Sequence, residues 1–410
     1  MNVLYITAAC LSKNTSANMS HNGYVQGLLE NGANLDIIMA NDSWGEADQK
    51  MQRWPQAKYY EFNATSLGNH IKSLGKRFSP PPKSQTVLTQ DASNHTPTTE
   101  SKTLRNTLKK VFYKIFRQDP LYPLNATWLR NASRFRSEKY YDLVVTNSSP
   151  SASHKLMSLL KASGRISFNH WIQIWEDPWY DDLYGNHSEL VKAEEASLLQ
   201  DADEIYYVSP LTLHYQKILF PASAQKMKCI PLPFLKFSND DSPVPNNDAI
   251  SFGYFGDYYS HTRNLLPFYN AIARSGFKGH IYGDSDLSLA STEKVTVSRR
   301  VTLDVLERVQ KQTDILVHLC NLSGGQIPGK IYHYSATNKP ILFILDGTAE
   351  ERKIIHKYFD KFNRYVFCEN TEESISNALC ELTEHFECHI GKPVLSFSPK
   401  EVVKQLFEYS

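Results

Sequence analysis

Short apolar runs and amphipathic segments alternate along the first half of the chain. The run at 2–8 has the length of a buried strand, and the segment 24–30 has helical spacing and ends at Asn31-Gly32. Further strand-like runs lie at 35–40, 141–147, 166–175, 204–208 and 228–232, and helical segments extend through Leu160 and over 183–200. Strands that alternate with helices predict an α/β domain built on a parallel sheet.

The same alternation resumes after residue 247. Apolar runs of strand length lie at 250–254, 280–282, 295–297, 314–319 and 341–345, and helical segments lie at 264–274, 302–312, 348–358 and 371–386. Ser398 and Glu401 have the spacing of a capping box and predict a final helix. The segment 237–247, FSNDDSPVPNN, has the composition of a linker. We therefore expect domains at 1–236 and 248–397, followed by a C-terminal helix over 398–410.

Length, charge and cysteine pattern narrow the class of protein. The 410 residues suffice for two domains with separate cores, and the net charge of +1 gives no sign of nucleic-acid binding. The six cysteines are scattered, form no CxxC pair and have no histidines at zinc spacing, so we expect a reduced, cytoplasmic protein. The N-terminal apolar run is short and lacks a basic flank, so neither a signal peptide nor a membrane-spanning helix is expected.

One stretch of the first domain departs from the strand–helix alternation. Residues 79–103 are rich in Pro, Ser, Thr and Gln and predict a mobile surface insertion. The next segment, 104–117, has apolar residues at helical spacing with Lys and Arg between them. From Lys72 to Lys139 the chain has 14 Lys and Arg against four acidic residues, a charge of +10, which leaves −9 elsewhere. This asymmetry favours contact with an anionic membrane surface or a lipid-pyrophosphate; an ordinary half-buried helix with a basic outer face is the alternative.

The segment 314–346 concentrates the chemistry of the second domain. The strand-like run 314–319 is followed by a loop with Gly324-Gly325, and Pro328 can open a helix because the first helical position needs no N–H. Lys330 then lies in the first turn, where the helix dipole already attracts anions. Backbone N–H groups and a lysine at one helix end suit a phosphate group. The helix is expected to end at Lys339-Pro340.

Three short motifs follow one another in this segment: Pro328-Gly329-Lys330, Tyr332-His333-Tyr334 and Asn338-Lys339-Pro340. They resemble the donor-binding unit of GT-B fold glycosyltransferases of the family 4 type, in the branch common in bacterial surface-polysaccharide synthesis. The resemblance spans nearly the whole chain. It implies an α/β fold of two Rossmann-like domains facing across a cleft, with the last helix crossing back to the first domain. Where that family carries glutamates for the transferred sugar and the ribose, this chain has Gly325 and His333.

The resemblance implies that the second domain binds a nucleotide-diphospho-sugar. The expected donor-binding residues are Gly256, Arg263, Gly325, Gly329, Lys330 and His333. Arg263 would face the diphosphate opposite Lys330; a solvated loop charge is the alternative for this arginine. Two cations suffice to hold a diphosphate leaving group without a metal ion, so we expect no metal and no cofactor beyond the nucleotide sugar. Asp284-Ser285-Asp286 imitates a DxD metal motif, but the family has a glycine-rich loop there, and we expect no metal site.

The expected catalytic and acceptor-binding residues follow strands of the first domain. His21, Asn22 and Gly23 belong to a predicted loop, 10–23, at the carboxyl end of the first strand, where ligands of α/β sheets bind. A capping or exposed histidine is the alternative for His21. Glu176 and Asp177 follow the strand 166–175, and adjacent residues of an extended chain point to opposite sides. The resemblance favours Asp177 for acid–base work and leaves Glu176 to the acceptor; a turn or helix cap before Pro178 is the alternative.

These features predict a glycosyltransferase of the hexosyltransferase type. It would move a sugar from a nucleotide-diphospho-sugar to a saccharide or lipid-linked saccharide, in polysaccharide or glycoconjugate synthesis and in contact with the cytoplasmic face of a membrane. The resemblance implies a retaining, metal-independent reaction in which Asp177, or else His21, orients or deprotonates the acceptor hydroxyl. Two alternatives remain. The absence of glutamate at 325 and 333 favours a non-catalytic protein that binds sugar nucleotides, and it disfavours a GT-B sugar-nucleotide epimerase.

Overall fold

The structure of the protein, a computed structural model, describes residues 1–13, 15–41, 53–64, 121–183, 185, 187–234 and 250–408. The predicted insertion 79–103, the basic segment 104–117 and the linker 237–247 lie outside the described residues. Within the described ranges, no helix is both long enough and apolar enough to cross a membrane.

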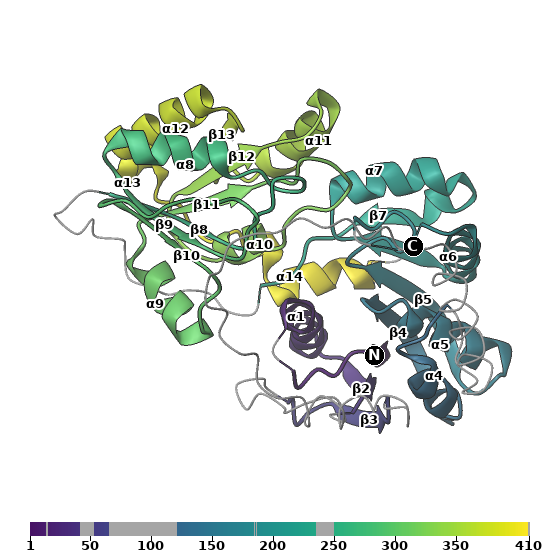
Figure 1. The fold of residues 1–410 in the computed structure, drawn as a ribbon. Helices are drawn as coiled ribbons and strands as arrows, with labels where there is room; N and C mark the ends of the chain where they lie inside the picture. Colours follow the sequence, from purple (N-terminus) through teal and green to yellow (C-terminus); the bar gives the residue numbers. More distant parts are fainter. Residues whose placement is uncertain are drawn as a thin grey trace, which may run out of the picture.

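A seven-stranded parallel sheet organises the N-terminal part of the chain, with strand order β3-β2-β1-β4-β5-β6-β7 (Figure 1). Neighbouring residues of β4 point to opposite faces of this sheet, so that Val144 and Val145 enter two different apolar cores. The elements are β1 (Asn2–Ile6), α1 (Ser16–Glu30), β2 (Asn34–Ala40), β3 (Lys58–Phe62), α4 (Ala126–Ala132), β4 (Tyr140–Ser148), α5 (Ala152–Ala162), β5 (Ser167–Trp175), α6 (Glu189–Asp201), β6 (Glu204–Tyr207), α7 (Pro210–Leu219), the 3₁₀ helix η1 (Pro221–Lys226) and β7 (Met227–Cys229).

A six-stranded parallel sheet organises the C-terminal part, with strand order β10-β9-β8-β11-β12-β13. Helices α8 and α12 lie side by side over one face of this sheet, and α9 lies on the opposite face (Figure 1). The elements are β8 (Ser251–Phe255), α8 (Leu266–Ser275), β9 (Lys278–Tyr282), β10 (Val295–Ser298), α9 (Leu303–Gln312), β11 (Ile315–Leu319), α10 (Lys330–Tyr334), β12 (Ile341–Leu345), α11 (Ala349–Asp360), β13 (Val366–Glu369), α12 (Glu372–Glu384), α13 (Phe386–His389), η2 (Leu395–Phe397), α14 (Pro399–Lys404) and η3 (Gln405–Phe407).

Helix α1 begins earlier than the sequence predicted. Thr15 caps it by accepting a hydrogen bond from Asn18 N, so the candidate residues 21–23 lie inside a helix. The Asn18 side chain folds back on the preceding loop and donates to the carbonyls of Cys10 and Lys13, both at 2.8 Å. The prediction of a loop over 10–23 is therefore wrong, because these polar residues satisfy the start of a helix rather than a longer loop.

Two other helices differ from the prediction at one end. Helix α6 starts at Glu189 rather than at 183, with Ser188 as its N-cap. Helix α10 has only five residues and ends at Tyr334, well before Lys339. Lys339 is buried, and its Nζ donates to three carbonyls at the C-terminal end of α9, at 2.6–2.9 Å. The Asn338-Lys339-Pro340 motif therefore closes a neighbouring helix instead of ending its own.

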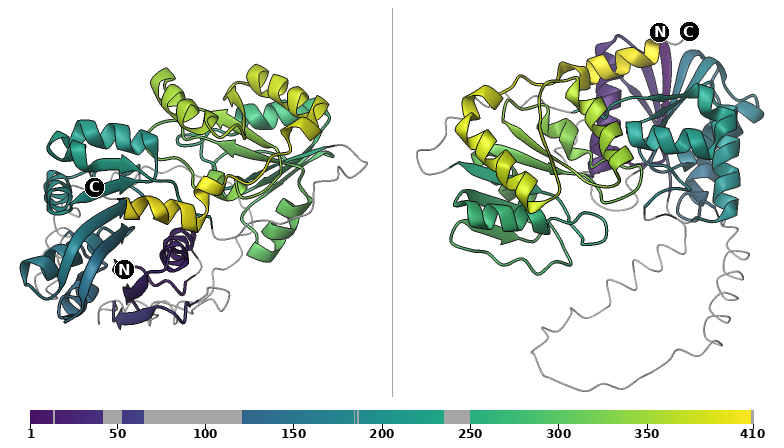
Figure 2. Two further views of the ribbon diagram at one scale, coloured as in Figure 1. Left: turned by 180° about the vertical axis from the view of Figure 1, so that it is seen from behind. Right: turned by 90° about the horizontal axis from the view of Figure 1, so that it is seen from above.

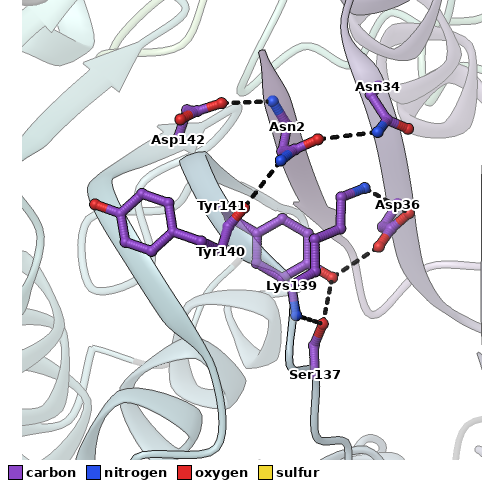
Figure 3. Close-up of polar contacts among 8 residues, drawn as sticks. All are labelled: Asn2, Asn34, Asp36, Ser137, Lys139, Tyr140, Tyr141 and Asp142. Atoms are coloured by element: carbon purple, nitrogen blue, oxygen red, sulfur yellow. Dashed lines mark hydrogen bonds and ion pairs between the residues drawn. The ribbon is translucent and has the colours of Figure 1, made fainter.

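Polar side chains tie the central strands together at the amino-terminal edge of the first sheet (Figure 3). Asn2 N donates to Asp142 Oδ2 at 2.7 Å, and Asn34 Nδ2 donates to Asn2 Oδ1 at 2.9 Å. Asp36 is buried and accepts from Tyr141 OH at 2.7 Å. This edge lies at the amino ends of the strands, and its polar residues help to fix how neighbouring strands pair. Ligands of open α/β sheets bind at the opposite edge, where the strands have their carboxyl ends.

The C-terminal segment returns to the first sheet. Helix α14 lies next to α1, and both chain ends lie on the same part of the molecule (Figure 2). Val402, Val403 and Leu406 are fully buried in the core on the α1 side of the first sheet. Ser398 caps α14 by accepting from Glu401 N. The last described residues thus complete a core whose other members come from the first domain.

Candidate active site

A cavity of about 760 Å³ opens in the C-terminal sheet, at the carboxyl ends of β8, β9 and β11. Its size falls within the range of small-molecule sites, about 300–1,000 Å³. Four of the predicted donor-binding residues line it, namely Gly256, Arg263, Gly329 and Lys330. The lining also includes residues that were not predicted, among them Asp257, Tyr282, Gly283, Arg300, His318 and Tyr334. We call this the cationic cavity, after Arg263, Arg300 and Lys330.

Arg263 is held by neutral oxygen atoms. Its Nε donates to Asn321 Oδ1 at 2.9 Å, and its Nη1 donates to the backbone carbonyl of Asp257 at 3.0 Å. No carboxylate forms an ion pair with it among the described residues. The guanidinium is therefore oriented toward the cavity without being neutralised, which suits a phosphate ligand.

Arg300 differs from Arg263 because a carboxylate neutralises it. Its Nε donates to Asp257 Oδ1 at 2.8 Å, its Nη2 contacts the other oxygen of the same carboxylate, and Asp284 lies 3.6 Å away. The Arg300 guanidinium holds the pKa of Asp257 below its usual value. Arg300 lies just beyond the end of β10, so strand pairing brings it next to the loop that follows β8.

Lys330 is the first residue of α10 and is half-buried. Burial lowers its pKa to about 8, an effect that Asp257 opposes and that Arg263 and Arg300 increase. Lys330 has no hydrogen-bond partner within the part of the chain that the structure describes. A half-buried ammonium group without a partner is available to a bound anion.

The two loops at the mouth of the cavity touch backbone to backbone. Gly256 N donates to Tyr282 O at 2.9 Å, and a Cβ on Gly283 would lie 1.9 Å from Gly256 O. Any residue other than glycine at 283 would push the β8 loop away. This contact keeps Asp257 next to β9 and β10, where Arg300 pairs with it.

His318 lines the cationic cavity, and it was not predicted from the sequence as a site residue. It lies within β11, is buried, and packs edge-on against Phe343 with ring centroids 4.5 Å apart. Burial lowers its pKa to about 3, so the imidazole is neutral. Its Nε2 is buried without a hydrogen-bond partner among the described residues.

Gly325 and His333, the remaining predicted donor residues, lie outside the residues that line the cavity. The Gly325 carbonyl accepts hydrogen bonds from Ser209 Oγ at 2.8 Å and from Thr212 Oγ1 at 2.7 Å. A Cβ at Gly325 would lie 2.9 Å from Thr212 Cα, so no side chain fits here in this packing. The loop thus docks its backbone on the start of α7. Burial lowers the pKa of His333 to about 4.

A buried polar chain connects two of the predicted first-domain residues. Tyr5 OH lies 2.8 Å from His21 Nδ1, and Asn147 Nδ2 donates both to Tyr5 OH at 3.0 Å and to Glu176 Oε1 at 3.3 Å. Burial lowers the pKa of His21 to about 4. The side chain of His21 is fully buried, so its ring contacts protein groups rather than an open surface. Burial also raises the pKa of Glu176, and the neighbouring Asp177 adds to that effect.

Asn22 and Gly23 also have contacts inside the protein. Asn22 Nδ2 donates to the carbonyls of Leu11 and Asn18, at 3.1 and 2.8 Å. Gly23 packs against Pro233, whose Cγ would lie 2.7 Å from an added Cβ. Both residues lie in α1, and their predicted acceptor role was tied to the loop that the structure replaces with this helix.

Asp177 faces the boundary between the two sheets. Gln326 Nε2 donates to Asp177 Oδ1 and, at 3.2 Å, to Asp182 Oδ2. The same amide accepts a hydrogen bond from Leu183 N at 3.2 Å. Gln326 lies two residues before Pro328, so one side chain links the loop after β5 to the cationic cavity. Burial raises the pKa of Asp177, which the Gln326 hydrogen bond opposes.

The carboxylates of the Asp284-Ser285-Asp286 segment bind protein groups. Asp286 accepts from Ser260 N at 2.7 Å and from Ser260 Oγ at 2.6 Å, while Asp284 lies near Arg300. Within the described residues, no group of three or more His, Cys, Asp or Glu side chains is arranged to hold a metal ion. The hydrogen bonds and the ion pair of this segment hold the loops around the cavity together.

Comparison with known proteins establishes the fold. No protein-family model matches the chain, and no curated protein matches it in sequence. Solved structures match over nearly the whole chain. HepE from Anabaena, in complex with UDP and glucose, is 12% identical with a TM-score of 0.55, and the match covers 100% of this chain and 98% of HepE.

Two further solved structures match the fold of this chain to a similar extent. Sucrose-phosphate synthase from Thermosynechococcus elongatus is 12% identical with a TM-score of 0.54, covering 99% of this chain and 94% of the synthase. A glycosyltransferase from Rickettsia africae is 13% identical with a TM-score of 0.54, covering 99% and 97%. The sheet topology and these neighbours confirm the predicted fold: two Rossmann-like domains in the GT-B arrangement.

Proposed function

We propose that the protein is a glycosyltransferase that uses a nucleotide-diphospho-sugar. The observation that carries this proposal is the cationic cavity at the carboxyl ends of parallel strands, where the lining includes three cations, Arg263, Arg300 and Lys330, and one carboxylate, Asp257, which pairs with Arg300. Open α/β sheets bind ligands at this edge. A cavity with excess positive charge and room for a nucleotide suits a nucleoside diphosphate better than a neutral ligand. The structure of HepE, which has the same fold, was solved with UDP and glucose. UDP is therefore the first nucleotide to test for binding.

In the proposed reaction, the sugar passes to an acceptor hydroxyl with retention of configuration at its anomeric carbon. The acceptor oxygen forms a bond to the anomeric carbon, and the bond from that carbon to the diphosphate oxygen breaks. The electron pair leaves with the diphosphate, whose growing charge Arg263 and Lys330 stabilise. The acceptor proton passes to Asp177, whose raised pKa suits a general base, or to the departing phosphate oxygen. We propose that these cations replace a metal ion in this role.

The proposed acceptor is a saccharide or a lipid-linked saccharide. Asp177 lies in the first domain and contacts Gln326 of the second, so a hydroxyl bound near Asp177 would approach the donor from across the domain boundary. Polysaccharide or glycoconjugate synthesis is the setting we propose for such a reaction.

The proposal is tested by incubating the full chain with UDP-sugars, GDP-sugars and TDP-sugars and measuring released nucleoside diphosphate, with and without EDTA. We expect release from one class of donor, unaffected by EDTA and about 100-fold slower in Lys330→Ala. Arg299→Ala is the matched control, because Arg299 is exposed beside Arg300 and does not line the cavity. Equal rates in Lys330→Ala and in the control would refute the assignment.

A second candidate is a protein that binds sugar nucleotides without transferring the sugar. The observation that favours it is the packing of Gly325 on Thr212, which leaves no space for the glutamate of the related family. Tight nucleotide binding without donor turnover, tested with a panel of saccharide acceptors, would establish this function. Donor turnover that depends on Lys330 would exclude it.

A further inference from the structure

A second cavity, of about 280 Å³, lies in the first domain and shares no lining residue with the cationic cavity. It is formed by the segment 121–125 and by the loops that follow β4 and β5, two strands that are neighbours in the sheet. Its lining includes Tyr122, Ser148, Trp175, Asp177, Trp179 and Asp182. Its volume lies just below the lower end of the range for drug-sized ligands, about 300 Å³, which suits a single ring.

Aromatic side chains form the apolar part of this cavity. Trp175 is fully buried, and Trp179 is half-buried and packs against Tyr122 with ring centroids 5.1 Å apart. The indole of Trp179 is therefore fixed in orientation by its neighbour while keeping part of its surface accessible. A rigid, partly accessible indole suits a ligand that has an apolar face and a polar rim.

Carboxylate and hydroxyl groups that can form hydrogen bonds also line this cavity. Asp177 and Asp182 each give one oxygen to the Gln326 amide, and carboxylates accept hydrogen bonds from ligand hydroxyls. Ser148 is 2% exposed, and its Oγ has no hydrogen-bond partner among the described residues. A buried hydroxyl without a partner costs free energy unless a ligand or a water molecule satisfies it. Ser148 Oγ is thus an independent sign of a polar ligand.

The charge of the cavity restricts which ligands fit. Asp177 and Asp182 lie close enough for one amide to bridge them, and the described residues that line the cavity include no Lys or Arg. A phosphate or a carboxylate bound here would meet two like charges in a partly dehydrated site. A ligand with hydroxyl groups and no negative charge meets only hydrogen-bond acceptors and the indole.

We propose that this cavity binds a neutral sugar ring, the terminal unit of the acceptor. The inference rests on the proposed glycosyltransferase function and deepens it by naming the acceptor class and the residues that select it. Trp179 receives the apolar face of the ring, and Asp182 and Ser148 hydrogen-bond to its hydroxyls. Sugars that carry a phosphate or a carboxylate on this ring are rejected.

The test is saturation-transfer NMR on the full chain, with and without UDP, using methyl glycosides of neutral hexoses as probes. A methyl glucuronide and glucose 6-phosphate are the charged comparisons. We expect signals from neutral glycosides only, and about tenfold weaker affinity in Trp179→Ala. Tyr140→Ala is the matched control, because it removes an exposed aromatic ring at the opposite edge of the same sheet (Figure 3).

Two subtler variants keep the proposal testable if Trp179→Ala does not fold. Ser148→Ala removes only a hydroxyl and is expected to weaken neutral-glycoside binding severalfold, whereas Asp182→Asn is expected to admit the glucuronide. Signals that are absent for all neutral glycosides, that are equal in Trp179→Ala and Tyr140→Ala, or that favour the charged sugars would overturn the inference. Sugar binding does not require the donor site. Sugar binding without nucleotide binding would therefore refute the proposed function alone, and nucleotide binding without sugar binding would refute this inference alone.

Discussion

At the scale of single residues, the three cations of the main cavity have different environments. Arg300 is paired with Asp257, Arg263 is oriented by an amide and a carbonyl, and Lys330 is half-buried with a lowered pKa. In the function that we propose, the Arg300–Asp257 pair leaves Arg263 and Lys330 to supply the positive charge for a diphosphate. Burial lowers the pKa of Lys330 to about 8, so we expect this lysine to link ligand binding to pH.

We predict that affinity for a nucleoside diphosphate falls as pH rises through about 8, the pKa of Lys330. Burial has lowered this pKa, so the charged form that binds the anion predominates below pH 8 and is progressively lost above it. The loss should approach about tenfold per pH unit, since one proton is linked to binding. Titration calorimetry between pH 6 and pH 9.5 measures it. Lys330→Arg should flatten the profile, and an identical fall in that variant would assign the proton elsewhere.

At the scale of elements, the loop 324–326 is the contact that joins the two halves of the site. Its glycine carbonyl accepts hydrogen bonds from Ser209 and Thr212 at the start of α7, and its glutamine bridges Asp177 and Asp182. Close packing against Thr212 leaves no space for a side chain at position 325. The loop uses backbone rather than a side chain at this point, because Thr212 occupies the space.

We predict that Gly325→Glu, which introduces the residue that the sequence resemblance led us to expect at this position, destabilises the protein instead of increasing transfer. The new Cβ would lie 2.9 Å from Thr212 Cα, so α7 or the loop must move. The expected cost is about 1–3 kcal/mol, the range for overpacking. Thermal unfolding measures it, with Ser323→Ala, exposed in the same loop, as the control. Unchanged melting with faster transfer would show that the loop opens freely.

The sequence predicts some site residues and elements and misses others. Gly329 and Lys330 can be predicted from the sequence because they belong to one contiguous motif. Arg300 is not, since it reaches Asp257 only through the pairing of β8, β9 and β10. Strands β3 and β13 were missed because they are short edge strands with weak apolar patterns. The start of α1 was missed because its polar residues are equally typical of a loop until Thr15 is seen to cap them.

At the scale of the whole molecule, the chain crosses between the two sheets more than once. Gln326 of the second domain contacts the loop after β5, and α14 returns from the second domain to complete the core beside α1. The first connection includes Asp177, a candidate site residue, whereas the second packs α14 against α1.

We predict that Leu406→Ala destabilises the first domain by about 2–5 kcal/mol while leaving nucleotide affinity intact. Leu406 is fully buried against residues from β1, β2 and α1, whereas the cationic cavity is lined by the second domain. Denaturant unfolding followed by tryptophan fluorescence reports the change, because Trp171 and Trp175 lie in the first sheet. Lys404→Ala, exposed on the same segment, is the control. A loss of less than 1 kcal/mol would mean that the C-terminal segment is dispensable.

The most direct test of the central claim is calorimetric binding of UDP, GDP and TDP to the wild-type chain and to Arg263→Ala, Lys330→Ala and Arg299→Ala. One nucleoside diphosphate should bind, with affinity reduced about tenfold or more in the first two variants and unchanged in the third. Such a result would place the diphosphate between Arg263 and Lys330. Binding of none of the three, or binding that is indifferent to Arg263 and Lys330, would contradict the account of a nucleotide-sugar site in this cavity.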